Sequence, residues 1–408
     1  MSLPTRRQKE PGPRQLSCEI LDRIDQGRAR ASQELARLGG GLQDDRDLRL
    51  ATELVYGTLR HRSEIDFYLE QLSGRPLERI EPALRSCLRT GLYQILHLDR
   101  VPPSAAVDEA VTLATARSGR RGGSFVNAVL RSACRKRREL HLPPEGNDPV
   151  GFLALRHSVP AWMVSRWWKR LGEHETRSLL LCLSRPALLS LWVHPDRSDP
   201  ERLALELFAE GVLTEASPFL PGSLRVRSGQ PQKTRPFLMG HCYIQDEASQ
   251  AIPLLMSAAP GEVLADACSA PGGKAFLLAC RVESEGRVLA IDRSLSRLRT
   301  LVENRDRLDL PNVLPVAADL EVGLPLVGPL AGVLVDAPCT GTGILRRQPE
   351  IRWRRSPSDL SSLVQRQSAL LDAAAQLVAP GGRLVYSVCS LEREEGEDRV
   401  EFFLARHA

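Results

Sequence analysis

Apolar residues recur at steps of three and four along the first third of the chain. One stripe runs from Leu50 to Leu59, and another consists of Leu84, Cys87, Leu88, Leu92 and Ile95. This spacing places the side chains on one face of a helix. Glycine and proline turns separate the stripes at residues 39–41, 74–76, 102–104, where Ser104 is a predicted N-cap, and 119–123. Between Arg14 and Leu140 the pattern predicts an all-α bundle of about six helices.

A mixed region follows the bundle. Prolines and a glycine within 141–149 indicate a linker. Beyond it, helical patterns are followed by an alternating strand, another helix and an extended stretch, which together predict a small α+β unit. The segments, in order, are 162–171, 175–183, 188–193, 200–210 and 224–226.

From Gly261 onward, short apolar runs alternate with helical segments such as 294–308 and 360–378. The runs are 263–267, 287–291, 313–317, 333–335 and 384–386. Repeated strand and helix predict a doubly wound parallel sheet. Ligands bind such sheets beyond the carboxyl ends of the strands, so the residues that follow these runs are the functional candidates.

Composition narrows the classes of function. With 408 residues, 42% of them hydrophobic, the chain is long and apolar enough for two or three folded domains. Nine cysteines without a Cys-x-x-Cys pair, and eight scattered histidines, fit neither a disulfide framework nor a local zinc motif, so no metal is predicted. The sequence shows no apolar run of membrane-spanning length and no signal peptide. We therefore expect a cytoplasmic protein without a membrane partner.

A loop of small residues follows the first run of the parallel sheet and opens a helix. It consists of Cys268, Ser269, Ala270, Pro271, Gly272, Gly273 and Lys274. Two glycines let the backbone approach a ligand, and the free N–H groups at the start of a helix can bind a carboxylate. The loop has neither the Gly-x-Gly-x-x-Gly spacing of dinucleotide sites nor that of triphosphate sites.

Carboxylates end the next two runs. Asp292 is placed to accept hydrogen bonds from both hydroxyls of a ribose, and Asp319 could hold the amino group of a purine. Alone, either residue would more often be an N-cap or a solvated turn residue. Because they end successive strands, a nucleoside-containing cofactor is the stronger interpretation.

The last two runs each precede a cysteine. Cys339 lies in Asp336-Ala337-Pro338-Cys339-Thr340-Gly341, and Cys389 lies in Tyr386-Ser387-Val388-Cys389-Ser390. Two thiols at two strand ends suggest covalent attack on an electrophilic base, because a thiolate is the strongest nucleophile that a side chain offers at neutral pH. A pair of buried, inert cysteines is the competing interpretation.

Together these motifs resemble the S-adenosylmethionine-dependent RNA 5-methylcytosine methyltransferases, in order and spacing over about 150 residues. The helical region, including 51–60 and 124–131, resembles the NusB fold. The two in series resemble the bacterial small-subunit ribosomal RNA methyltransferase B family. The resemblance implies three domains: a NusB-like RNA-binding domain at 1–140, a small α+β region at 141–244, and a Rossmann-like methyltransferase at 245–408. It also implies S-adenosylmethionine as cofactor and small-subunit ribosomal RNA as partner of a monomer.

The chemistry suits two cysteines. Cytosine C5 is too weakly nucleophilic to accept a methyl group until a thiolate has added at C6. A base must then remove the C5 proton before the thiol can leave. In the family the cysteine at the position of Cys389 attacks and the one at Cys339 assists release. Asp336 is expected to hydrogen-bond the cytosine edge and also to border the cofactor.

Two arginine clusters are candidates for RNA contact. Residues 343–355 interleave arginines with Trp353, which suits phosphates and a stacked base, although a solvated loop would have a similar composition. Residues 131–138 form a basic cluster that suits RNA or the end of a helix equally well.

Two departures from the family pattern leave alternatives open. Val388 replaces a usual threonine, and the chain stops at Ala408, where the family continues into two more strands. We therefore expect about five strands, with the Cys389 strand at an uncovered edge. An RNA-binding assembly factor with impaired catalysis is one alternative. A DNA cytosine methyltransferase attacking from Cys339 is another, but the presence of Cys389 speaks against it.

Overall fold

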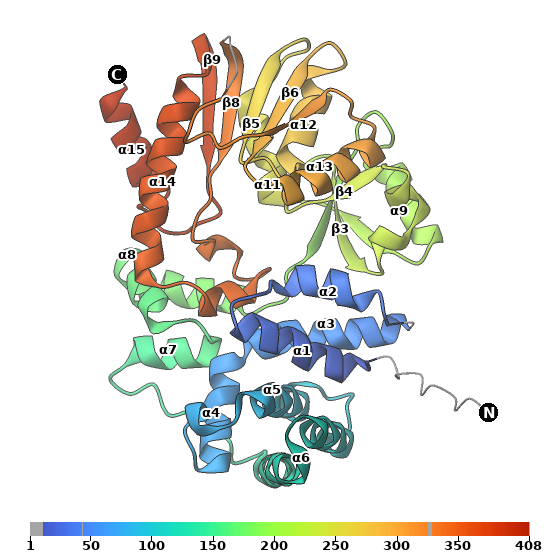
Figure 1. Cartoon of the computed structure of the whole chain (residues 1–408), viewed down its shortest axis with the longest axis vertical. Helices are drawn as coiled ribbons and strands as arrows, with labels where there is room; N and C mark the ends of the chain where they lie inside the picture. The colour runs from blue at the N-terminus through green and yellow to red at the C-terminus, as the bar shows by residue number, and fades with distance from the viewer. Residues whose placement is uncertain (1–10, 43, 325–328, 408) are drawn as a thin grey trace, which may run out of the picture. The chain divides into compact units, whose positions relative to one another are not determined.

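The computed structural model describes residues 11–42, 44–324 and 329–407 and divides into two units (Figure 1). The first unit runs to Pro186 and also contains Ile344–Arg355. The second unit contains Ala187–Gly343 and the chain from Ser356 onward. A short segment of the C-terminal half is therefore part of the fold of the N-terminal half, which no sequence pattern indicated.

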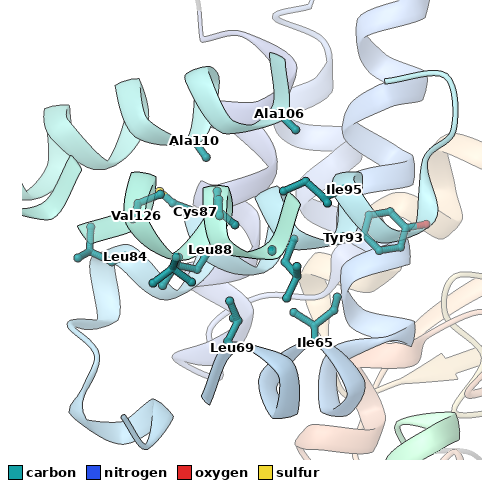
Figure 2. Close-up of a cluster of buried hydrophobic side chains, with 14 of the residues drawn as sticks. Ile65, Leu69, Leu84, Cys87, Leu88, Tyr93, Ile95, Ala106, Ala110 and Val126 are labelled. Atoms are coloured by element: carbon teal, nitrogen blue, oxygen red, sulfur yellow. The ribbon is translucent and has the colours of Figure 1, made fainter. Parts of the chain in front are cut away.

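The first unit is helical, as the apolar stripes predict. Its α-helices are α1 (Pro13–Asp25), α2 (Ala31–Gly39), α3 (Asp45–Arg60), α4 (Arg62–Ser73), α5 (Pro82–His97), α6 (Pro103–Lys136), α7 (Pro149–His157) and α8 (Ala161–Leu183). The stripe on α5 packs against α4 and α6, and Figure 2 shows Leu84, Cys87 and Leu88 facing Leu69 and Val126. Burial of this stripe is the main term that stabilises the bundle.

Three features of the helices differ from the predictions. The helix α6 begins at Pro103, so Ser104 lies inside it and the predicted N-cap is wrong. Gly119 has a φ of 70°, which kinks α6 where the sequence predicted a turn. Gly172, with a φ of 80°, likewise joins two predicted helices into the kinked α8.

Arg352 anchors the segment Ile344–Arg355 inside the first unit. Its side chain is fully buried, and its guanidinium donates to the backbone carbonyls of Arg60 at 3.4 Å, His157 at 3.0 Å, Ser158 at 3.2 Å and Leu183 at 2.8 Å. The helices α3, α7 and α8 end at Arg60, His157 and Leu183. The last carbonyls of a helix lack intrahelical donors and carry partial negative charge. One cation therefore caps three helix ends.

This arrangement corrects the prediction of RNA contact within residues 343–355 for Arg352, Trp353 and Arg354; for the other arginines of the segment it stays a prediction. Arg352 is inaccessible, and the Trp353 ring packs on the core of α1–α3 with Arg62 5.1 Å from its centroid. Arg354 donates to the carbonyls of Gly27 and Ala29. These side chains stabilise the first unit, so arginines interleaved with an aromatic residue were a misleading sign of RNA contact.

The second unit begins with a four-stranded antiparallel sheet of order β2-β3-β1-β4. Its elements are β1 (Leu189–Val193), α9 (Pro200–Ala209), β2 (Leu213–Ala216), β3 (Ser223–Ser228), α10 (Arg235–Leu238) and β4 (Cys242–Ile244). A small α+β unit is present, but the two helices predicted at its start, 162–171 and 175–183, form α8 of the first unit. The sequence did not indicate β2 and β4, because they are short and lack clear alternation.

A five-stranded parallel sheet of order β7-β6-β5-β8-β9 follows (Figure 1). Its strands are β5 (Val263–Ala267), β6 (Arg287–Asp292), β7 (Val313–Ala317), β8 (Leu330–Asp336) and β9 (Val378–Ser387). The helices of this part are α11 (Glu247–Ala251), α12 (Gly273–Val282), α13 (Leu295–Leu308), α14 (Pro357–Ala375) and α15 (Glu397–Arg406). The doubly wound sheet is confirmed, with β9 at one edge of the described strands.

Side chains of the strands alternate between two cores. Leu264, Val288 and Leu334 pack with α12 and α13 on one face, while Val333 and Val335 pack with α14 on the other. All five strands run parallel, so their carboxyl ends meet at one edge of the sheet. The predicted site residues follow those ends. Of the helices described, none is long and apolar enough to cross a membrane.

Candidate active site

The loop after β5 is shaped by its packing. Gly272 has a φ of 106°, and a Cβ at this position would lie 2.4 Å from the Phe276 ring and 2.9 Å from Leu301. Only glycine fits both the left-handed backbone and the space. The tight turn leads directly into α12, so the backbone N–H groups at the start of that helix lie at the carboxyl edge of the sheet.

Asp292 holds this loop against the end of β6. Its buried carboxylate accepts hydrogen bonds from the Ala270 N–H at 3.2 Å and the Ser294 N–H at 2.8 Å, and Arg297 forms an ion pair with it at 3.2 Å. Asp319 follows β7, half-buried, and accepts from the Glu321 N–H at 3.1 Å. The structure thus brings Asp292 to the predicted loop and leaves Asp319 at the next strand end.

Asp266 is a site residue to which the sequence assigned no role. It lies within β5, fully buried, and its Oδ2 accepts from the Ser269 hydroxyl at 2.9 Å. Its Oδ1 is buried and has no hydrogen-bond partner within the described residues. Burial raises the pKa of this carboxyl to about 7. A carboxylate inside an otherwise apolar strand was the sequence feature that could have identified this residue.

The raised pKa predicts that stability falls with pH. Below about pH 4 the carboxyl is protonated in both folded and unfolded protein, while between about 4 and 7 only the unfolded form ionises. The free energy of unfolding should therefore drop across this window, by at most roughly 4 kcal/mol. Asp266→Asn should remove that part of the drop, so urea unfolding would show it gaining on the wild type between pH 5 and pH 8.

The exposed carboxylate of α13 provides a matched control for this experiment. Asp306→Asn makes the same chemical change on the surface of the same unit and should follow the wild type at both pH values. If the unfolding free energies of Asp266→Asn and the wild type ran parallel from pH 5 to pH 8, Asp266 would not be the group responsible.

Asp336 joins the loop after β5 to the end of β9. Its Oδ2 lies 2.5 Å from the ammonium of Lys274, and its Oδ1 accepts from the Ser387 hydroxyl at 2.8 Å. Lys274 is a predicted cofactor residue, so two predicted groups are in direct contact. Ser387 was not predicted; its place at a strand end, two residues before Cys389, was the only signal. The carboxylate is fixed from two sides and keeps a partly exposed face.

The two cysteines meet across the ends of the adjacent strands β8 and β9. Their sulfur atoms lie 3.1 Å apart; Cys389 is exposed and Cys339 is buried. The hydrogen bond between the thiols lowers the pKa of Cys389 and raises that of Cys339. This geometry favours an accessible Cys389 thiolate that accepts a hydrogen bond from a protonated Cys339.

Backbone and side-chain hydrogen bonds also join the two cysteine loops. The Gly343 N–H donates to the Cys389 carbonyl at 3.0 Å, and the hydroxyls of Thr340 and Thr342 lie 3.0 and 3.2 Å from that of Ser390. These contacts fix one loop against the other, so the distance between the sulfurs does not depend on the thiols alone.

Histidines distant in sequence do converge outside this site. In the first unit, Glu64 Oε2 lies 2.9 Å from His61 Nδ1 and 3.5 Å from His97 Nε2, and the two rings are 4.0 Å apart. Burial lowers the pKa of His97 to about 4. Glu64 hydrogen-bonds His61, whereas His97 Nε2 has no hydrogen-bond partner among the described residues, and we assign no ion to the cluster.

Comparison with known proteins agrees with both halves of this architecture. The family model described as 16S rRNA methyltransferase RsmB/F matches residues 253–408, and that of the NusB family matches residues 12–135. A probable ribosomal RNA small subunit methyltransferase B from Synechocystis is 34% identical over 369 residues, which are 88% of this chain and 81% of the relative.

Solved structures share the fold. The crystal structure of PH0851 superposes with a TM-score of 0.82 at 25% identity, over 100% of this chain and 91% of that protein. NSun6 from Pyrococcus horikoshii, crystallised with SFG, has a TM-score of 0.57 at 22% identity and covers 60% of this chain and 87% of its own. The chain therefore belongs to the ribosomal RNA small subunit methyltransferase B family of S-adenosylmethionine-dependent enzymes.

Proposed function

We propose that this enzyme methylates C5 of a cytosine in 16S ribosomal RNA, through a covalent bond between Cys389 Sγ and C6 of the base. The observation that carries the proposal is the pair of sulfurs 3.1 Å apart at the carboxyl ends of β8 and β9, with Cys389 exposed. A DNA-type reaction would require attack from Cys339, and the burial of that thiol argues against it.

The chain supplies groups suited to attack, to recognition of the base and to release of the product. Addition of the Cys389 thiolate at C6 makes C5 nucleophilic; after methyl transfer the C5 proton passes to a base while the C6–S bond breaks and Cys389 leaves as a thiolate. Asp336 is fixed by Lys274 and Ser387, with an exposed face that can hydrogen-bond the polar edge of a cytosine. Cys339, adjacent to the attacking sulfur, is positioned to assist release by donating a hydrogen bond to the Cys389 sulfur as it leaves C6.

The residues at the carboxyl edge fit the cofactor of the family. The unpaired Asp266 Oδ1 suits an ammonium group, and the N–H groups at the start of α12 suit a carboxylate; S-adenosylmethionine carries both on its methionine part. Asp292 and Asp319 follow the next two strands, where a ribose and a purine would lie. S-adenosylmethionine supplies an electrophilic methyl group. NSun6, which shares the fold, was crystallised with SFG, an analogue of that cofactor.

Bisulfite sequencing of 16S ribosomal RNA tests the proposal. We expect one cytosine to be protected in wild-type cells, converted when the gene is deleted, and protected again when the wild-type gene, but not Cys389→Ala, is restored. An unchanged pattern of cytosine protection after deletion would contradict the proposal. Defective small-subunit assembly with that unchanged pattern would instead favour the assembly-factor alternative.

A further inference from the structure

Glu395 is a fully buried carboxylate beneath the loop that carries Cys339. Its Oε1 accepts hydrogen bonds from the Thr340 N–H at 2.8 Å and from the Gln367 side-chain amide at 3.0 Å, and its Oε2 accepts from the Thr340 hydroxyl. A buried carboxylate is costly unless its oxygens are satisfied, and here three donors surround it. The function proposed above leaves this residue without a role.

The backbone on both sides of Cys339 is held by this group. Glu395 binds the N–H of the following residue, Thr340, while Gln367 on α14 donates to the carbonyl of the preceding residue, Pro338, at 2.9 Å. Gln367 is itself fully buried. Two peptide groups that flank one residue and are both fixed leave its side chain a narrow range of directions. The hydrogen bonds to Thr340 and Pro338 therefore restrict the orientation of the Cys339 thiol.

Glu395 is also connected to the loop that carries Cys389. The Thr340 hydroxyl that donates to Glu395 also lies 3.0 Å from the hydroxyl of Ser390, the residue after Cys389. The Tyr386 hydroxyl, near the end of β9, donates to the main-chain carbonyl of Glu395 at 2.7 Å. Glu395 is thus hydrogen-bonded to residues at the ends of both β8 and β9, the strands that bring the thiols together.

Charge distinguishes the two thiols. The hydrogen bond to Cys389, burial and the negative charge of Glu395 all raise the pKa of Cys339. On the other side of the pair, Cys339 is the main cause of the lowered pKa of Cys389, Asp336 opposes that shift, and Lys274 assists it. Burial raises the pKa of Tyr386, with added contributions from Cys339 and Glu395, while Arg399 opposes them. The charge of Glu395 thus adds to the hydrogen bond and to burial in favouring a protonated Cys339.

We propose that Glu395 is a positioning residue that orients Cys339 toward Cys389 and keeps Cys339 the protonated member of the pair. This role deepens the reaction proposed above, because it determines which of the two sulfurs is the nucleophile. Glu395 acts through Thr340 and Cys339 and does not touch the base.

Glu395→Gln isolates the charge from the hydrogen bonds. The Gln carbonyl can still accept from Thr340 N–H and Gln367, and its amide can donate to the Thr340 hydroxyl, which is able to accept. Gln367→Leu keeps the charge of Glu395 and removes the amide that donates both to the Pro338 carbonyl and to Glu395. Glu401→Gln, the same change at an exposed site on α15, is the matched control.

The reactivity of each thiol can be measured without RNA or cofactor. The purified full-length chain is alkylated with iodoacetamide from pH 6 to pH 9, and peptide mass spectrometry gives the rate at each cysteine. In wild type and Glu401→Gln, Cys389 should react well before Cys339. In Glu395→Gln the ratio of the two rates should fall several-fold, because the negative charge that favours a protonated Cys339 is removed. With RNA, kcat should fall while KM for RNA stays unchanged.

A folded Glu395→Gln protein with the wild-type alkylation ratio would overturn the proposal. If Glu395→Gln does not fold, Gln367→Leu decides: a reduced ratio supports the positioning role, and an unchanged ratio refutes it. Because this assay needs no methyl transfer, its result stands even if 16S ribosomal RNA proves not to be the substrate. A failure of the proposed function would instead appear in the bisulfite experiment, so the two failures are distinguishable.

Discussion

Replacing Cys389 with alanine should reduce methyl transfer to RNA by roughly a thousandfold or more, because Cys389 is the exposed thiol among the described residues at the carboxyl edge of the sheet. Replacing Cys339 with alanine should have a different outcome. Attack by Cys389 would still occur, but the step that releases the enzyme from the base would fail. Cys339→Ala should therefore accumulate as a covalent complex with RNA that survives a denaturing gel.

A third cysteine provides the control for this pair of variants. Cys182 on α8 is exposed and lies outside the site, so Cys182→Ala should methylate RNA at the wild-type rate and leave no adduct on the gel. An adduct from Cys389→Ala and none from Cys339→Ala would reverse the two roles. The exposure of Cys389 and the burial of Cys339 favour Cys389 as the attacking thiol.

Replacing Arg352 with methionine should lower the free energy of unfolding of the first unit by roughly 3 to 5 kcal/mol. Methionine retains much of the side-chain volume, so the loss comes mainly from carbonyls at three helix ends that lose a charged donor, at about 1–3 kcal/mol each. A buried charge can often be replaced by an apolar side chain without loss, but only when its partners are replaced too. The partners of Arg352 are backbone carbonyls, which no substitution can replace. Thermal or urea unfolding measures the change.

Two further variants sharpen this experiment. Arg352→Lys should recover only part of the stability, because one ammonium cannot span acceptors at three helix ends as a planar guanidinium does. Arg346→Met removes an exposed guanidinium that binds a single carbonyl, that of Pro186, and should cost about 1 kcal/mol or less. Equal losses for Arg346→Met and Arg352→Met would show that the convergence of helix ends has no special effect.

The sequence predicted those parts of the fold that depend on local periodicity. Val263–Ala267 and Val313–Ala317 were located to the residue, because each is a compact apolar run between turn signals. The strand β9 is longer than its predicted apolar centre, since Val378–Gly382 carries no alternation and pairs with β8 through a shifted register. Periodicity identifies the buried core of a strand better than its ends.

In the candidate active site, too, the sequence predicted some residues and missed others. Motif residues such as Asp292 and Asp336 could be named from strand ends, whereas their partners Ala270 and Ser387 depend on how distant loops meet. Glu395 and Arg352 were missed or misinterpreted for one reason. Both are charged residues in polar stretches, where burial is the rare outcome, and only tertiary contacts decide it.

The position of Arg352 in the sequence also affects the order in which the protein can be completed during synthesis. The helices that it caps lie before Pro186, but the cap itself is translated roughly 170 residues later. At about 5–20 residues per second, the end of α8 waits on the order of 10 to 30 s for its cation, and the ends of α7 and α3, which are made earlier, wait longer. By then the ribosome has already translated Cys339. The nascent N-terminal unit therefore matures only after part of the catalytic site has been made, and a fragment ending at Pro186 should remain short of its full stability.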